Sequence, residues 1–276
     1  MTVIDAHQHF WKYDPAVHTW MDDRMVAIKK DFMPDVLKEE LDSNGVEGCV
    51  AVQADQSDHE TRFLIDLAKS YPFIRGVVGW TNLQSTGVGE CLEKYTDEPV
   101  VKGFRHVVQD EPNPAFMQQQ SFQNGISLLG KHNFTYDILI LPHQLSAALQ
   151  LVRKFPDQLF VIDHLAKPGI SDQKMEPWRT YIYELGRHDH VYCKVSGMVT
   201  EAHWHGWQYE DFLPYLDAAL EAFGAERLMF GSDWPVCLLS AGYNKVKQIT
   251  DRYISGLSSS EQSMIMGENT VRFYRL

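Results

Sequence analysis

Short runs of apolar, β-branched and aromatic residues alternate along the chain with longer segments whose apolar positions recur every three or four residues. The short runs predict eight strands, at Val3–His9, Val46–Gln53, Ile74–Trp80, Val100–Val107, Thr135–Leu141, Leu159–His164, His190–Ser196 and Arg227–Asp233. Each gap between them is long enough for the helical crossover that parallel strands require. The pattern therefore predicts a parallel sheet covered by helices.

Helix signals occur in the intervening segments. Ser57 precedes Glu60 by three residues, and Ser258 precedes Glu261 in the same way, which is the capping-box pattern at the start of a helix. Gly224 follows an apolar stripe with helical spacing and predicts a helix C-terminus. Eight strand–helix repeats without a dividing linker favour a single-domain (β/α)₈ TIM barrel over residues 1–276. A doubly wound sheet shares this pattern, but no Gly-x-Gly-x-x-Gly follows the first strand.

Composition narrows the class of protein. The chain has 276 residues, 44% of them hydrophobic, and a formal net charge of −12, which argues against a nucleic-acid-binding protein. The four cysteines lie far apart with no Cys-x-x-Cys pair, which favours reduced thiols. No apolar run approaches the roughly 18 residues of a membrane span. We expect a cytoplasmic protein that binds a small molecule and neither a membrane nor nucleic acid; a homo-oligomer is compatible with the sequence.

Polar residues end five of the eight predicted strands. In a (β/α)₈ barrel the C-terminal ends of the strands meet at one face, where reactive groups cluster. His7 and His9 are two residues apart on the first strand, so their side chains point the same way. The other strand-end residues are Arg105, His106, Asp163, His164, Lys194, Ser196 and Asp233. A single strand-end histidine is more often a hydrogen-bonded rim residue, but five such strands together indicate an active site.

Several of these residues lie in recognisable motifs. The motifs are His7–Trp11, Gly103–His106, Asp163–Pro168, Lys194–Gly197 and Phe230–Val236. They resemble the motif series of the amidohydrolase superfamily and, more narrowly, its sugar-lactone hydrolase branch, which includes L-fuconolactonases and L-rhamnonolactonases. The likeness extends to Asn269–Tyr274 and so covers nearly the whole chain. The resemblance implies a (β/α)₈ fold and hydrolysis of an ester or related bond.

The resemblance also suggests roles for the strand-end residues. His7, His9, His164 and Asp233 would bind one divalent ion, with zinc first among the candidates. Asp233 matches the family position for a metal ligand or general base and is our candidate proton shuttle, with His164 and Arg105 as further catalytic residues. The predicted fifth strand contains no histidine, which argues against the binuclear sites of metal-rich members. A metal-free site that uses the same residues as acids and bases is the alternative.

Aromatic and basic residues around the same face are candidates for substrate binding. They are Trp11, His106, Lys194, Trp204 and His205. Trp204 and His205 belong to a long connection, residues 197–208, and loops at this face of a barrel usually carry specificity. The first connection, Phe10–Pro34, is also long, and Trp20 within it is a candidate lid residue.

We expect a lactonase that opens a sugar-derived lactone to the aldonic acid. A metal-dependent decarboxylase or an ester hydrolase of the same superfamily, acting on an aromatic acid, is the second hypothesis. The third is a catalytically silent barrel that only binds sugar acids. The convergence of His7, His9, His164 and Asp233 argues against the third, because a pure binder has no need of four titratable groups in one place.

Overall fold

Eight parallel strands form one sheet whose order follows the chain from β1 to β8. The computed structural model describes residues 2–276. The strands are β1 (Ile4–Gln8), β2 (Gly48–Val52), β3 (Ile74–Gly79), β4 (Val101–Val107), β5 (Thr135–Leu139), β6 (Phe160–Ile162), β7 (Val191–Val195) and β8 (Leu228–Phe230). All eight predicted strands are confirmed. Nearly every strand residue is buried, as expected for a parallel sheet covered on both faces.

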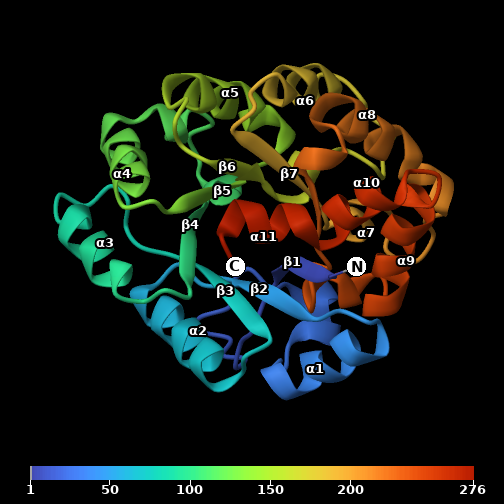
Figure 1. Cartoon of the computed structure of the whole chain (residues 1–276), viewed down its shortest axis with the longest axis horizontal. Coiled ribbons are helices and arrows are strands. Elements are labelled where there is room, and N and C mark those ends of the chain that lie inside the picture. The colour runs from blue at the N-terminus through green and yellow to red at the C-terminus, as the bar shows by residue number, and fades with distance from the viewer. Residues whose placement is uncertain (1) are drawn as a thin grey trace.

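The sheet closes where β1 meets β8. Gln8 forms a parallel bridge with Trp234, His9 N donates to Trp234 O at 2.7 Å, and Asp233 N donates to His7 O at 2.8 Å. Most of the helices lie in a ring around the strands in Figure 1. This ring confirms the predicted (β/α)₈ barrel and excludes the open doubly wound sheet, in which the first and last strands would not meet.

Helices follow the strands around the barrel. They are α1 (Pro34–Ser43), α2 (Asp58–Ser70), α3 (Val88–Thr96), α4 (Gln120–Lys131), α5 (Leu145–Lys154), α6 (Trp178–Gly186), α7 (Met198–Glu201), α8 (Leu213–Phe223), α9 (Tyr243–Ile254), α10 (Ser259–Ser263) and α11 (Asn269–Tyr274). Gly224, with φ of +65°, ends α8 as predicted. Ser258 and Glu261 form the reciprocal capping box before α10. The Ser57 side chain caps α2, but the Glu60 carboxylate accepts from Ala54 N instead.

The last predicted helix is divided in two. A π-helical turn, Met264–Glu268, separates α10 from α11. Helix α11 then crosses one end of the barrel, as Figure 1 shows, in contact with β1 and β8. Phe273 and Tyr274 pack there against the barrel interior, in a cluster with side chains from β1, β2, β3, β6, β7 and β8. This end is therefore closed by the C-terminal helix, and the opposite end holds the strand C-termini.

The remaining expectations from composition concern thiols and membranes. All four cysteines are free, and Cys49, Cys193 and Cys237 are buried. Within residues 2–276, no helix combines the length and the apolar character needed to cross a bilayer.

Candidate active site

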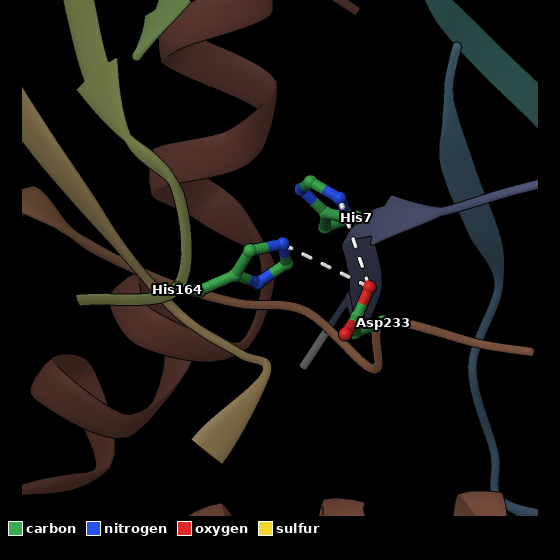
Figure 2. Close-up of side chains that lie close together, drawn as sticks. All are labelled: His7, His164 and Asp233. Atoms are coloured by element: carbon green, nitrogen blue, oxygen red, sulfur yellow. Dashed lines mark ion pairs between the residues drawn. The ribbon is translucent and has the colours of Figure 1, made fainter. Parts of the chain in front are cut away.

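Three imidazoles and one carboxylate meet at the C-terminal ends of the strands. His7 and His9 come from the end of β1, His164 follows β6, and Asp233 follows β8. The Nε2 atoms of His7 and His9 are 3.1 Å apart. Asp233 Oδ1 lies 3.5 Å from His9 Nε2, 3.8 Å from His164 Nε2 and 3.9 Å from His7 Nε2. Figure 2 shows His7 and His164 both pointing toward the Asp233 carboxylate. The barrel thus brings together the four residues that the sequence predicted as metal ligands.

An unusual backbone positions two of these side chains. His164 and Asp233 both have left-handed φ values, of +54° and +57°. Such values are uncommon for residues other than glycine and cost about 1–3 kcal/mol, so they persist only where the surrounding structure imposes them. They cluster at functional sites, and here they end β6 and β8 early and turn both side chains toward His7.

The two β1 imidazoles have different partners. His9 Nδ1 lies 2.8 Å from Val52 O, which can only accept, so this nitrogen carries a hydrogen. His7 Nε2 lies 3.3 Å from an Arg105 guanidinium nitrogen and His7 Nδ1 lies 3.2 Å from Lys194 Nζ, so a cationic donor faces each ring nitrogen of His7. The donor set fits a divalent ion.

Burial controls the ionisation of this cluster. Desolvation lowers the pKa of His7 well below its usual range and lowers that of His164 to about 4. Burial would raise the pKa of Asp233, but attraction to the facing imidazoles outweighs it and leaves this pKa below its ordinary value. At neutral pH His7 and His164 are therefore neutral and Asp233 is a carboxylate, the forms that bind a metal ion and accept a proton.

A cavity of about 430 Å³ opens above these groups. His9, His164, Asp233 and Arg105 lie at its base. Its wall contains aromatic, aliphatic and polar residues; the aromatic and polar ones include Trp11, Trp20, Trp204, Asp55, Gln56, Gln109, Asp110, Lys167, Thr200 and Glu201. Lys167 Nζ lies 3.4 Å from Glu201 Oε1. A small polyhydroxylated ring would find both a flat apolar surface and hydrogen-bonding groups here.

The chain is similar to known proteins over nearly its whole length. The amidohydrolase family model matches residues 4–276. This chain belongs to the amidohydrolase family. It is 37% identical to the L-fucono-1,5-lactonase of Burkholderia multivorans, over 99% of this chain and 96% of that protein. It is 34% identical to the L-fucono-1,5-lactonase of Burkholderia ambifaria, over 99% of this chain and 95% of that protein.

Solved structures agree with this assignment. A crystal structure of an amidohydrolase from Burkholderia multivorans with bound zinc superposes with a TM-score of 0.96. The two chains are 37% identical, and the alignment covers 100% of each. The family and the fold predicted from the motifs are therefore confirmed.

Three of the predicted substrate-binding residues of this amidohydrolase lie outside the lining of the cavity. Lys194 is fully buried beneath the site and bonded to Asp137 and Asp163. His106 stacks on Phe116 and lies 2.7 Å from Glu111. His205 borders a separate surface depression. Among the candidates for substrate binding, the structure places Trp11 and Trp204 in the cavity wall.

Arg105 connects the cavity with the barrel interior. One guanidinium nitrogen, Nη1, donates to Asp163 Oδ2 at 3.0 Å, and Nη2 donates to Gln53 O at 2.5 Å. Its buried Nε has no hydrogen-bond partner among the described residues. The guanidinium therefore carries a structural ion pair and still borders the cavity.

Sequence reasoning did not assign functions to several residues around the site. Asp163 was recognised at the end of a strand but given no role, although it contacts His7, Arg105 and Lys194. Asp137 lies in the predicted fifth strand, where no pattern marks it. Lys167 lies within the Asp163–Pro168 motif and Glu201 within the connection 197–208, and their charges on barrel loops are a usable signal.

Proposed function

We propose that this amidohydrolase is a lactonase that hydrolyses a neutral sugar-derived lactone, such as L-fucono- or L-rhamnonolactone, to the aldonic acid. The observation that carries the proposal is the contact of the Asp233 carboxylate with three imidazoles at the base of a polar and aromatic cavity. The full-length likeness to two L-fucono-1,5-lactonases supports it.

His7, His9, His164 and Asp233 are the residues that would hold a divalent ion, which we propose to be zinc. The zinc-bound crystal structure of the relative supports this choice. When bound, such an ion polarises a carbonyl group and lowers the pKa of a water molecule.

The side chains of this chain supply the proton transfers. The oxygen atom of the attacking water bonds to the lactone carbonyl carbon, and Asp233, which is ionised and buried, takes a proton from that water. The ring C–O bond then breaks, and Asp233 returns that proton to the departing alkoxide, which becomes a hydroxyl group of the product. His164, held by a 2.8 Å contact between its Nδ1 and Ser196 Oγ, orients the carboxylate. Arg105, which lines the cavity, would hold an oxygen atom of the substrate through its guanidinium group.

The charges of the cavity favour a neutral substrate. Asp55, Asp110 and Glu201 line the wall, and Lys167, which also lines it, is paired with Glu201. A lactone that itself carried carboxylates would meet this acidic wall and be repelled. Trp11 and Trp204 offer flat surfaces for the less polar face of a sugar ring, and Thr200 and Glu201 offer hydrogen bonds to its hydroxyl groups.

Acid release from a panel of aldonolactones in weak buffer tests this function. We expect turnover of one or more deoxy-sugar lactones, loss of activity on chelation, recovery with zinc, and a decrease of about 10²–10⁴-fold in kcat for Asp233→Asn. Asp251→Asn is the matched control, because Asp251 pairs with Lys247 on α9, away from the cavity lining. Carbon dioxide release from a hydroxybenzoate in place of lactone opening would favour the decarboxylase, and tight binding of aldonic acids without turnover would favour a silent barrel.

A further inference from the structure

Beneath the site, the barrel interior contains a group of fully buried polar side chains. Asp137 from β5, Asp163 after β6 and Lys194 from β7 are each 0% exposed, and Tyr274 from α11 is buried beside them. Lys194 Nζ lies 2.5 Å from Asp137 Oδ2 and 2.9 Å from Asp163 Oδ1. Tyr274 OH donates to Asp137 Oδ2 at 2.7 Å. These contacts form a continuous chain from the C-terminal helix to Asp163.

Stability alone does not account for this arrangement. Desolvating an ammonium and two carboxylates costs several kcal/mol for each ion, and well-packed apolar side chains of similar volume often stabilise a core as well or better. A TIM barrel interior is ordinarily filled by branched aliphatic residues. The presence of charges here points to a requirement other than packing.

At the Asp163 end of this series of contacts lies His7, a proposed metal ligand. His7 Nδ1 lies 3.3 Å from Asp163 Oδ1 and 3.2 Å from Lys194 Nζ. Arg105 Nη1 lies 3.3 Å from the other ring nitrogen, Nε2. Lys194 and Arg105 approach Asp163 on different oxygens, at 2.9 and 3.0 Å, and so fix the carboxylate that lies beside His7 Nδ1.

We propose that Lys194 and Tyr274 are positioning residues, which act through Asp137 and Asp163 to fix the orientation of the His7 ring. Tyr274 holds Asp137, Asp137 and Asp163 hold the Lys194 ammonium, and Lys194 and Asp163 both contact His7 Nδ1. His7 Nε2 is thereby turned toward Asp233. This inference rests on the proposed role of His7 as a zinc ligand. It gives the C-terminal helix, which closes the far end of the barrel, a part in the active site.

Zinc affinity, measured by competition with a chromophoric chelator, tests the proposal without any substrate. Lys194→Met should bind zinc about 10–100-fold more weakly, the usual effect of removing a group that orients a metal ligand. Tyr274→Phe removes one hydrogen bond and should act in the same direction by up to about tenfold. Tyr215→Phe is the matched control, because its buried hydroxyl donates to Gly169 O outside this chain of contacts and its loss should leave zinc affinity unchanged.

Two further readouts separate positioning from a general loss of structure. In both variants kcat should fall while KM stays within about twofold. The imidazole ¹⁵N shifts of His7 in zinc-free protein should agree between the parent and the control and should differ in Lys194→Met, because Lys194 Nζ contacts His7 Nδ1. If Lys194→Met does not fold, Tyr274→Phe decides.

Zinc affinity within twofold of the parent in the folded variants would overturn the proposal, as would a parent protein that binds no zinc. Failure of the parent to open any lactone would contradict only the proposed function, because zinc binding and the imidazole shifts are measured without substrate.

Discussion

The backbone after β7 turns at Gly197 with φ of +65°, directly against the ring of His164. A Cβ atom placed there would lie 2.6 Å from that ring, closer than such contacts occur. Glycine is therefore required both by the conformation and by the space that His164 occupies.

We predict that Gly197→Ala displaces His164 from Asp233. The expected result is at least a tenfold fall in kcat and a loss of about 1–3 kcal/mol in the free energy of unfolding, since the new residue is strained. Steady-state kinetics and urea unfolding measure the two effects. Gly206→Ala on the same connection is the control, because a Cβ atom there meets nothing within 4 Å. Equal kinetics for the two variants would contradict the prediction.

Strand periodicity explains which site residues the sequence could identify. His7 and His9 share a face because they are two residues apart, and the structure places their imidazoles together. Arg105 and His106 are adjacent, so their side chains leave β4 on opposite faces; Arg105 borders the cavity and His106 packs against Phe116. Lys194 shares a face with Ser196 but lies two residues earlier, one layer deeper in the barrel. The motif does not show how deep in the barrel a residue of the strand lies, and for this reason Lys194 was wrongly predicted to line the cavity.

At the scale of elements, two long connections meet above the cavity. The first connection brings Trp20 and Met25 to the cavity wall, and the connection after β7 brings Trp204. The Arg24 guanidinium carbon lies 5.8 Å from the centre of the Trp204 ring, a cation–π contact between the two segments. The segment that carries Trp20, the candidate lid residue, thus forms part of the cavity wall.

Arg24→Ala should loosen this contact. An exposed cation–π interaction contributes about 0.5–1 kcal/mol, so we expect KM for the lactone to rise up to about fivefold with kcat nearly unchanged. Lys29→Ala is the control, because Lys29 lies in the same segment but pairs with Asp23. A fall in kcat without a change in KM would show that Arg24 does not act by holding the segment closed.

Elements were predicted well where a pattern repeats and less well where the backbone is irregular. Continuous apolar runs located all eight strands, because strands of a parallel barrel are buried on both faces. The sixth and eighth strands end earlier than predicted. Residues 164–167 and Asp233 adopt left-handed conformations, which no hydrophobic pattern encodes for residues other than glycine. The π-helical turn between α10 and α11 was missed for a similar reason, since its apolar residues keep nearly helical spacing.

The stability of the whole molecule should depend on one buried carboxyl group outside the active site. Burial raises the pKa of Glu60 to about 7 from its ordinary value of 4.5. Between these pH values the native state retains a proton that the unfolded chain releases, so the free energy of unfolding decreases as pH rises through this range.

Glu60→Gln should remove that part of the pH dependence while keeping an acceptor for Ala54 N. Urea unfolding at pH 5 and pH 8 measures the difference, which should be smaller in Glu60→Gln than in the parent. Glu93→Gln, at an exposed position on α3, is the control and should leave the difference unchanged. An unaltered pH dependence in Glu60→Gln would show that Glu60 is ionised in the native state.

The barrel closes between its first and last strands, and the ligand set therefore combines residues made early and late in synthesis. His7 and His9 leave the ribosome with the first strand, whereas Asp233 follows only after the eighth strand has been made. A nascent chain therefore cannot assemble the complete ligand set until the eighth strand has emerged. Metal loading of the complete site has to follow that point of synthesis.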